Sequence, residues 1–463
     1  MRAARPDPAR GQALFAIGVA IVTALALLGL GRAGPATTAP IAPVPAASGA
    51  WVCPHGGGDG WTAVLFLANP GDEPVTARLT VLQKDRAGDP TSVEVPPGGT
   101  VRVDEPADDR SSSTYVEYFD GWIGAGWVLV SEGDEPGTAA EPCAPEPARR
   151  WYLADGTTGL GEDAYVIVAN PFDVRAVLDV VVFTSDSAPI RESDWTDLTI
   201  GAHRSAALHL NSHVKGEEAV GVELDVSVGR VAAASLGVTD RTRLRSALGT
   251  IGLARSVLLP IMKGSDRADL VVLSTADRSM RFGATQLGPE APRPAGGLTE
   301  QEQPPASAHS YAVTLETGPG GVEPFAIEDV PIAAALRAPG PSADRGSTGG
   351  TTSPGPDWLV LPAAGAGASK PGMVLLNPGD QAVSAHLEIL PREGGTAAAP
   401  VDVEVPPHGA AAVPASFLET APGSGVLVRA DGPISALAAT TSMGEDATET
   451  FALSMGVAVP QES

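Results

Sequence analysis

The sequence predicts an all-β chain of tandem repeats that follows one N-terminal transmembrane helix, and three observations support this prediction. The 463 residues include 54 Gly and 43 Pro, a composition typical of many short strands joined by turns. One motif, an apolar run ended by Asn-Pro, recurs at intervals of about 100 residues. An uncharged stretch at residues 11–31 precedes every copy of this motif.

The stretch at residues 11–31 is apolar all round, as a membrane-spanning helix should be. As a helix it would rise about 30 Å, which matches one hydrocarbon core. Arg2, Arg5 and Arg10 precede it, so residues 1–10 are expected in the cytoplasm and the rest of the chain outside. The sequence therefore predicts a signal anchor and a single-pass protein of the cell membrane whose bulk is extracytoplasmic.

A cleaved signal peptide is the alternative interpretation of this stretch. Its apolar region normally spans about 7–15 residues, and a cleavage site of small residues follows closely. The sequence "GRAGPA" is a poor match to such a site, so the length favours the uncleaved anchor. Both interpretations export the remaining chain, and cleavage would make it a secreted protein.

The repeated motif reads "LFLANP", "VIVANP" and "MVLLNP", with Asn69, Asn170 and Asn377 before the prolines. Ser274, in "VVLSTADRS", stands where a fourth copy is needed. Pro cannot donate to a strand ladder, it forces extended geometry on the preceding residue, and Asn can bond its own backbone in a turn. The motif therefore predicts the end of a buried strand. A tryptophan precedes three of the copies at a nearly constant distance, at Trp51, Trp151 and Trp358.

Each repeat is expected to hold about seven short strands in about 100 residues, with a turn every 8–12 residues. This spacing predicts an immunoglobulin-like β-sandwich. A propeller is the rival, but its four-stranded blades need only about 40–50 residues, half of the observed period.

The resulting domain plan has eight parts. They are a cytoplasmic region (1–10), the transmembrane anchor (11–31), a Pro/Ala-rich linker (32–50), repeat 1 (51–146), repeat 2 (147–255), a divergent repeat 3 (256–339) with a disordered insertion (288–310), a second linker (340–357) and repeat 4 (358–463). Repeat 3 is divergent because it lacks both the Trp and the Asn-Pro pair.

The stretch "WYLADG…YVIVANP…VELDVSVGRVAAASLG" resembles a W-Y-x-A-x-G…N-P repeat found in several copies in exported bacterial proteins. The whole layout is similar to an uncharacterised actinobacterial family with an N-terminal membrane segment followed by immunoglobulin-like repeats. The resemblance covers most of residues 51–460 and implies no catalytic residue.

Cys53 and Cys143 are the only cysteines and flank repeat 1. Export permits a disulfide between them, and closing a loop of about 90 residues would contribute roughly 4–5 kcal/mol in the chain-entropy model. Two ligands are too few for a metal site, and the spacing is not that of a C-x-x-C redox pair.

Catalytic, metal and nucleic-acid chemistry find little support. The net charge is −25 and the sequence contains no basic stripe, which argues against a nucleic-acid-binding protein. No G-x-S-x-G, Walker-type or H-E-x-x-H motif occurs, so we expect no enzyme and no cofactor. Two further groups of residues could be metal ligands. His209 and His213 are expected on a strand followed by a turn, which would place them roughly 13 Å apart, and His203 is expected at a turn. Asp104, Glu105, Asp108 and Asp109 are expected to form a solvated acidic loop, since the calcium-binding D-x-[DN]-x-[DN]-G pattern is missing.

Repeat 1 is unusually aromatic. Tyr115, Tyr118, Trp122 and Trp127 lie in "STYVEYFDGWIGAGW". If this stretch alternates as a strand, Tyr118 and Trp122 share one face and Phe119 takes the other. One interpretation is a large core with Trp packed on the disulfide, and the other is an exposed platform for a glycan or a protein partner.

These observations favour a non-catalytic, membrane-anchored protein of the bacterial cell envelope that acts as an interaction or scaffold protein. The expected partners are the membrane, through residues 11–31, and an envelope protein. The alternative is a cell-wall glycan-binding protein that uses the aromatic cluster of repeat 1.

Overall fold

The computed structural model describes residues 48–131, 137–185, 188–240, 243–262, 267–315, 319–340, 344–364, 368–395, 397–443 and 449–460. The expected cytoplasmic region, the anchor and nearly all of the first linker lie outside these residues. Within the described ranges, no helix is long and apolar enough to cross a membrane. Residues Ala46–Ser463 form one compact unit, and this unit is all-β, as the composition predicts.

The strands are grouped here into four structural repeats. Repeat 1 contains β1 (Gly49–Cys53), β2 (Thr62–Asn69), β3 (Val75–Leu82), β4 (Thr91–Val95), β5 (Gly99–Pro106), β6 (Ser113–Phe119), β7 (Gly124–Val130) and β8 (Thr138–Pro142). Repeat 2 contains β9 (Arg150–Leu153), β10 (Glu162–Asn170), β11 (Ala176–Phe183), η1 (Ser193–Trp195), β12 (Leu198–Ile200), β13 (Arg204–His209), η2 (Leu210–Ser212), β14 (Gly221–Val228), β15 (Ala232–Thr239) and β16 (Arg243–Leu248).

Repeats 3 and 4 follow the same plan with local changes. Repeat 3 contains β17 (Leu259–Ile261), β18 (Arg267–Ser274), β19 (Met280–Leu287), β20 (Arg293–Pro294), η3 (Ala295–Gly297), β21 (Gln301–Gln303), β22 (Ser307–Thr314), β23 (Gly320–Ala326), β24 (Ala333–Pro339) and β25 (Arg345–Thr348). Repeat 4 contains β26 (Gly355–Val360), β27 (Ala368–Asn377), β28 (Val383–Leu390), β29 (Val401–Val405), β30 (Gly409–Ala412), α2 (Ala415–Leu418), β31 (Gly425–Met443), β32 (Glu449–Met455) and β33 (Val457–Ala458).

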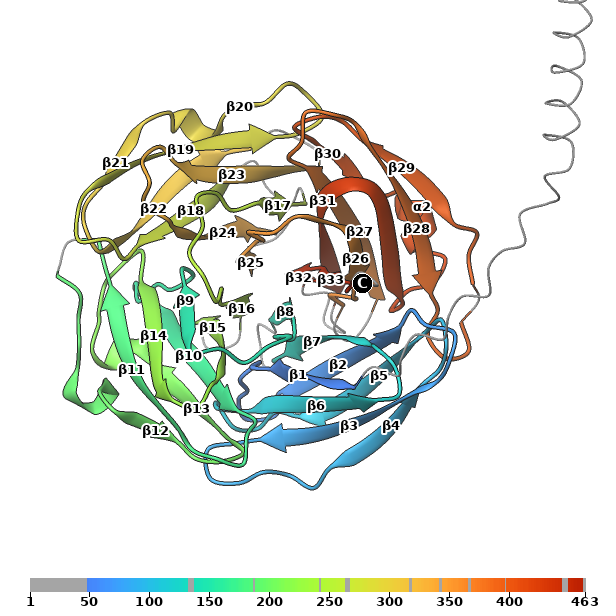
Figure 1. The fold of residues 1–463 in the computed structure, drawn as a ribbon, viewed down its shortest axis with the longest axis horizontal. Helices are drawn as coiled ribbons and strands as arrows, with labels where there is room; N and C mark the ends of the chain where they lie inside the picture. The colour runs from blue at the N-terminus through green and yellow to red at the C-terminus, as the bar shows by residue number, and fades with distance from the viewer. Residues whose placement is uncertain are drawn as a thin grey trace, which may run out of the picture. The chain divides into compact units, whose positions relative to one another are not determined.

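Each repeat forms two antiparallel sheets with a recurring strand order. In repeat 1 the orders are β1-β6-β3-β4 and β5-β2-β7-β8, and in repeat 2 they are β9-β14-β11-β12 and β13-β10-β15-β16. Repeat 3 has β17-β23-β19-β20 and β22-β18-β24-β25. In repeat 4 the long strand β31 pairs with strands of both sheets, so the two sheets are continuous through it. Figure 1 shows β8, β16, β25 and β32 near the centre of the unit and β4, β12, β21 and β29 at its periphery.

The strands in the middle of their sheets, such as β2, β10 and β18, are buried on both faces, and this explains their continuous apolar runs. In β2 every residue after Thr62 is buried, and β10 and β18 end in similar fully buried runs. Each sheet packs on one side against its companion and on the other side against a sheet of the next repeat. One apolar cluster joins repeat 1 with repeat 4, a second joins repeats 2 and 3, and a third joins repeats 3 and 4. Two-sided burial is the situation in which strands lose their alternation.

One backbone hydrogen bond recurs at all four seams between repeats. The acceptor is the backbone carbonyl of the residue that follows the third strand of one repeat. The donor is the backbone N–H of the second residue of the fifth strand in the next repeat. In repeat 3, β22 takes the place of the fifth strand. The four bonds are Ser205 N–H to Gln83 O (3.3 Å), Ala308 N–H to Thr184 O (3.2 Å), Ala410 N–H to Gly288 O (3.2 Å) and Thr100 N–H to Pro391 O (3.0 Å). The last of these joins repeat 1 to repeat 4, so the repeats contact one another in a closed circuit.

The Asn of the Asn-Pro motif fastens the strand end to two neighbouring segments. Asn377 Nδ2 donates to Gln381 O (2.7 Å), Val405 O (3.2 Å) and Pro406 O (3.1 Å), and its Oδ1 accepts from Gly379 N–H (2.8 Å). Asn69 and Asn170 make the corresponding bonds. The motif therefore acts as a buried clamp, beyond the strand-ending role predicted from Pro.

The tryptophans of the motif are also buried and equivalent. The indole N–H of Trp51 donates to Ile123 O (2.8 Å), that of Trp151 to Val231 O (2.7 Å) and that of Trp358 to Ile434 O (2.9 Å). Each bond ties the first strand of a repeat to the turn of the hairpin formed by its sixth and seventh strands, which in repeat 4 are the two halves of β31. Buried indoles need such a partner, and the recurrence supports the predicted alignment of repeats 1, 2 and 4.

Two expectations about the organisation were wrong. Residues 288–310 are not a disordered insertion, because they contain β20, η3, β21 and the start of β22. The second linker, 340–357, contains β25, which pairs with β24 at the edge of a repeat 3 sheet and lies near the centre of the unit (Figure 1). Packing explains one of its linker-like residues: a Cβ at Gly346 would stand 2.8 Å from Leu453.

The rejection of a propeller also needs correction. Sheets stacked face to face in a closed circuit are the arrangement of propeller blades. The period of about 100 residues excludes one blade per repeat, but each repeat supplies two sheets. The strand order within each sheet is not sequential along the chain.

The Asn clamp yields a stability prediction. Asn170→Ala removes a fully buried amide that donates to three carbonyl groups, so we expect the free energy of unfolding to fall by about 2–4 kcal/mol. Ser274 is the matched control, since it is fully buried and its Oγ has no hydrogen-bond partner among the described residues. Ser274→Ala should change stability by less than about 1 kcal/mol. Urea denaturation followed by circular dichroism measures both, and equal losses in the two variants would contradict the clamp.

Candidate functional site

The aromatic stretch of repeat 1 forms a hairpin and not one alternating strand. β6 ends at Phe119, and Asp120 adopts a positive φ of 68°, which is turn geometry. The expectation that Tyr118 and Trp122 share a strand face is therefore wrong. Phe119 is 37% exposed, and the Arg78 guanidinium lies 5.8 Å from its ring centre.

The four residues expected to form a platform do not share an open surface. Trp127 is 1% exposed and Tyr118 is 8% exposed, and both belong to the core that joins repeats 1 and 4. Trp122 is half-buried, with its ring edge-on to Trp51 at 6.1 Å. Tyr115 is half-buried and packs against the core of repeat 2. Two-sided burial of the sheets thus places most of this aromatic surface inside the unit.

The predicted Cys53–Cys143 disulfide is confirmed. Cys53 ends β1 in one sheet of repeat 1, and Cys143 follows β8 in the other. The bond therefore staples the two sheets of repeat 1. In the chain-entropy model a loop of this length stabilises the folded state by roughly 4–5 kcal/mol.

A buried polar chain lies beside the disulfide, and sequence reasoning missed it. His55 Nε2 lies 3.1 Å from Thr114 Oγ1, which lies 2.7 Å from Glu105 Oε2. Burial lowers the pKa of His55 to about 4 and raises the pKa of Glu105, so His55 is neutral at pH 7. His55 Nδ1 lies 2.6 Å from Gly56 O, and these partners orient the ring within the packed interior.

The largest group of buried charges joins repeats 2 and 3. Asp155 Oδ1 accepts from Arg337 Nε at 2.5 Å and lies 3.6 Å from Arg245 Nε. Arg337 also donates to Gly156 O and Glu218 O. Burial raises the pKa of Asp155, but the Arg337 and Arg245 guanidinium groups outweigh it and hold the pKa below its usual value. Arg245 Nη1 also donates to Glu162 Oε2 at 2.7 Å. Two carboxylates thus balance two guanidinium groups, and the network is a structural link between the repeats.

Two other buried carboxyl groups bridge seams near the centre of the unit. Glu141, on β8, is 1% exposed, and burial raises its pKa well above the ordinary value although the Leu248 backbone of repeat 2 hydrogen-bonds to it. Asp344, beside β25, accepts from Phe451 N–H of repeat 4 at 2.8 Å. Burial raises the pKa of Asp344 to about 7, against the opposing effect of that bond.

The histidines considered as zinc ligands lie apart from one another. His203 pairs with Asp173 (2.6 Å) and His209 with Asp163 (3.0 Å). His203 adopts a positive φ of 50°, as does its equivalent His408 at 44°, so the predicted turn position is confirmed. His213 differs from the other two because it meets a pair of acids, Glu192 and Asp194, within 4.8 Å, and it pairs with both.

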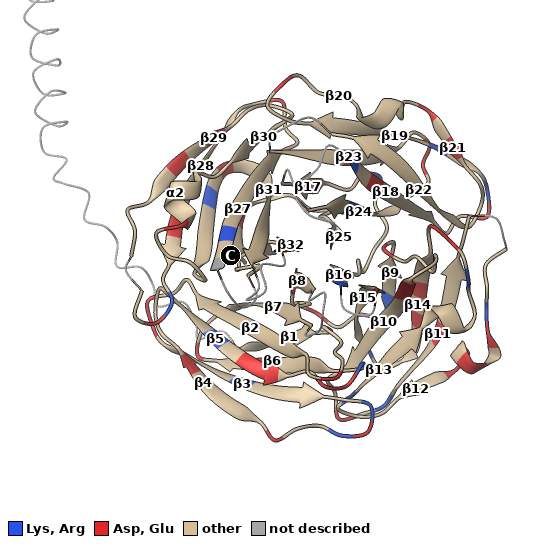
Figure 2. Cartoon of the chain, turned by 180° about the vertical axis from the view of Figure 1, so that it is seen from behind, with Lys and Arg blue, Asp and Glu red and all other residues tan. Residues whose placement is uncertain are grey.

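The acidic residues of repeat 1 do not form the expected loop, because Asp104 and Glu105 lie on β5. Asp104 pairs with Arg102, Glu105 turns inward to Thr114, and Asp109 Oδ1 accepts from Ser111 N–H and Oγ. Figure 2 shows acidic residues spread over all four repeats, which fits the solvating role expected of the net negative charge.

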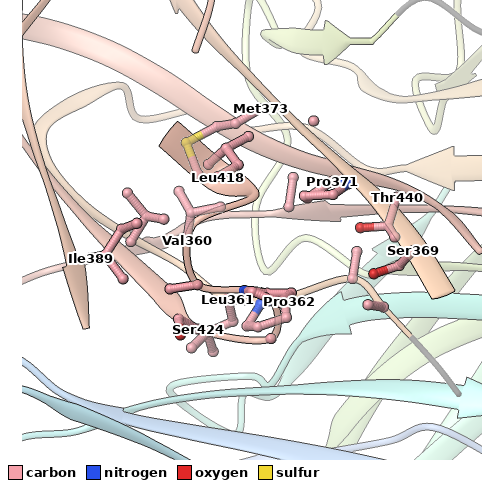
Figure 3. Close-up of a pocket in the computed structure, with 18 residues that line it drawn as sticks. Val360, Leu361, Pro362, Ser369, Pro371, Met373, Ile389, Leu418, Ser424 and Thr440 are labelled. Carbon is pink, nitrogen blue, oxygen red and sulfur yellow. The ribbon is translucent and has the colours of Figure 1, made fainter. Parts of the chain in front are cut away.

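The described part of the chain contains a small apolar cavity in repeat 4. It has a volume of about 40 Å³ and is lined by residues such as Val360, Met373, Ile389 and Leu418. Figure 3 shows these side chains around it, with Ser369 and Thr440 at one end. This volume holds at most a few water molecules.

Comparison with known proteins gives one family match. The model of a family of unknown function (DUF5719) matches residues 119–353. No curated protein matches the chain. One solved structure, described as a "Crystal structure of tetra-tandem repeat in extending region of large adhesion protein", is 9% identical, with 85% of this chain and 93% of that chain covered and a TM-score of 0.11. A score this low carries no structural argument.

The buried carboxyl of Asp344 yields a prediction of pH dependence. Its folded pKa of about 7 lies above its ordinary value of 3.8, so the folded state holds a proton that the unfolded state releases. Its contribution to stability is full below about pH 4 and is lost as the pH rises through about 7. We expect the protein to be more stable at about pH 5 than at about pH 8, with a loss of up to about 1.4 kcal/mol per pH unit.

Asp344→Asn tests the assignment by urea denaturation at both pH values. The difference in unfolding free energy between them should shrink in this variant, because the amide does not titrate. Glu141 contributes with the same sign, so part of the difference should remain. Asp85→Asn, at an exposed loop position, is the control and should leave the difference unchanged. An unaltered difference in Asp344→Asn would show that another group is responsible.

Proposed function

The chain belongs to the family of unknown function DUF5719, and from this premise we propose that it is a non-catalytic, membrane-anchored extracytoplasmic protein that acts as an interaction scaffold in the bacterial cell envelope. The observation that carries the proposal is the closed circuit of four repeats, fastened by one equivalent hydrogen bond at each seam. Such a unit presents loops and strand edges on a rigid body.

The distribution of buried charge supports a structural role for the polar interior. Asp155 pairs with Arg245 and with Arg337 across the seam between repeats 2 and 3, and Arg245 also pairs with Glu162. Glu141 and Asp344 have raised pKa values, which often mark active sites. Both, however, face backbone N–H groups of a neighbouring repeat within a packed seam. Their pKa values are raised because both groups are buried where two repeats join. Joining repeats is a structural task, as expected of a scaffold.

Sequence and disulfide support the proposed location. The Cys53–Cys143 bond is typical of an oxidising, extracytoplasmic compartment. Residues 11–31 would serve as the signal anchor, and the Pro/Ala-rich segment 32–50 would hold the folded unit away from the lipid surface as a semi-extended spacer.

We further propose that each repeat is a modified immunoglobulin-like sandwich. The support is a pair of antiparallel sheets per repeat, a buried Trp on the first strand of three repeats and the disulfide between the sheets of repeat 1. Partner binding would use the peripheral edge strands, such as β4 and β29, whose backbone groups face outward from the last ladder.

Location and topology are testable in cells with a C-terminal epitope tag. The full chain should remain in the membrane pellet after alkaline carbonate extraction, and external protease should remove the tag from intact spheroplasts. Deletion of residues 11–31 should abolish both results, because the anchor and export signal are one segment. A mature chain that begins near Ala47 in the culture medium would overturn the anchor and leave export standing. A tag protected from external protease would overturn the whole proposal.

The scaffold role is testable by photocrosslinking in the same cells. A photoreactive residue at the exposed Glu404 on β29 should give a discrete crosslinked envelope partner. The same probe at Ala439, which is 3% exposed, is the matched control and should give no intermolecular product. Identical patterns at both positions, or no product at Glu404 or at the equivalent Glu94 on β4, would contradict binding at the edge strands.

A further inference from the structure

The seam between repeats 3 and 4 contains a hollow of about 430 Å³, a volume within the usual range for small-molecule sites. Its lining includes Met262 from repeat 3 and a group of residues from repeat 4: Lys370, Gly372, Ala439, Thr441 and Phe451. The hollow is therefore bounded by both repeats.

The repeat 4 side of the hollow is an ordered row of three different side chains. Lys370 on β27 lies directly opposite Thr441 on β31, and Thr441 lies directly opposite Phe451 on β32. Cross-strand partners share one face of a sheet. An ammonium group, a hydroxyl group and an aromatic ring thus stand side by side. Lys370 is exposed, and no ion pair of its ammonium occurs within the described ranges of the chain.

The hollow exists because repeat 4 lacks one side chain. The next residue on the same face of β27 is Gly372, opposite Ala439. In repeat 2 the equivalent position, counted back from the motif Asn, is Tyr165. The Tyr165 ring stacks under the Arg110 guanidinium of repeat 1 at 4.9 Å, and this stack fills the corresponding part of the seam between repeats 1 and 2.

We propose that this hollow binds a small carboxylate carried on an apolar body. The Lys370 ammonium and the Thr441 hydroxyl would hold the carboxylate, since one cation and one donor match a single anionic group. The apolar body would lie over Gly372 and Ala439, between Met262 and Phe451. An ammonium group with no acidic partner among the described residues, in a chain of net charge −25, selects for an anion. The apolar lining disfavours strongly hydrated polyanions. This inference does not depend on the proposed scaffold role.

Isothermal titration of the full chain in lipid nanodiscs tests the proposal, with empty nanodiscs as the blank. The probes are hexanoate for an aliphatic body, 3-phenylpropanoate for an aromatic body and 1-hexanol as the uncharged counterpart of hexanoate. We expect saturable binding of at least one carboxylate at millimolar concentration or below. The stronger of the two carboxylates identifies the kind of apolar body.

Two variants separate the contribution of the Lys370 charge from that of the space above Gly372. Lys370→Met should weaken carboxylate binding about tenfold, the usual cost of a lost charged hydrogen bond, and leave 1-hexanol unchanged. Gly372→Val should abolish binding of every probe, because the new side chain fills the hollow. The only tight contact of its Cβ would be with the flexible end of Met262, at 3.0 Å, while Ala439 O would lie at the ordinary contact distance of 3.5 Å, so the fold should persist. Lys84→Met, at an exposed loop position, is the control and should bind as the wild type does.

Two results would overturn the proposal. One is no saturable binding of either carboxylate by the wild-type chain. The other is wild-type affinity for carboxylates in Lys370→Met. If Gly372→Val fails to reach the wild-type thermal midpoint, the Lys370→Met result alone decides.

Discussion

The contact that closes the circuit between repeats 1 and 4 is the constraint on which the fold depends. The Thr100 hydroxyl donates to Leu390 O and accepts from Gly425 N–H, while one apolar cluster runs through both repeats. Leu359 and Leu361 of repeat 4 reach Gly124 and Gly126 of repeat 1, where a Cβ would stand 2.4 and 2.9 Å from them. Without closure, the outer sheet faces of the first and last repeats would be exposed to water, at a cost of about 1.5–3 kcal/mol for each large apolar side chain.

Closure also explains what the sequence could and could not predict. The repeat length, the Trp and Asn positions and the turn at His203 follow from local chemistry, and all were recognisable. The runs "LFLAN" and "VIVAN" carried a further signal, because they do not alternate as half-buried strands should. That signal indicates burial on both faces, but it does not say which sheet covers the second face. Strand β25 resembles a linker because its small residues are selected by its neighbours and not by its own propensity.

The candidate site was harder to predict because its residues meet only in the folded chain. Asp155 and Arg337 are 182 residues apart in the sequence. Asp155 stands in the W-Y-x-A-x-G motif, but at a position that the motif leaves open, and Arg337 stands in no motif. For the aromatic residues of repeat 1, the sequence indicated a binding platform where the structure has none. Their number and spacing favour a platform only if the sheet is considered without its neighbours. Trp127 is covered because its sheet is covered on both sides. Aromatic residues that would lie on the surface of an isolated repeat are thus buried against the neighbouring repeat when the circuit is closed.

The four seams show how one geometry tolerates different chemistry. The recurring backbone hydrogen bond uses no side chain, so it persists where the repeats diverge. Around it, Arg110 stacks on aromatic rings between repeats 1 and 2, Asp155 binds arginines between repeats 2 and 3, and Asp344 accepts a backbone N–H between repeats 3 and 4. Even Ser274, which lacks the amide of the clamp, keeps its register with Ser307. Because closure fixes the backbone of every seam, side chains there are free to vary, and seams are where copies of one module acquire different properties.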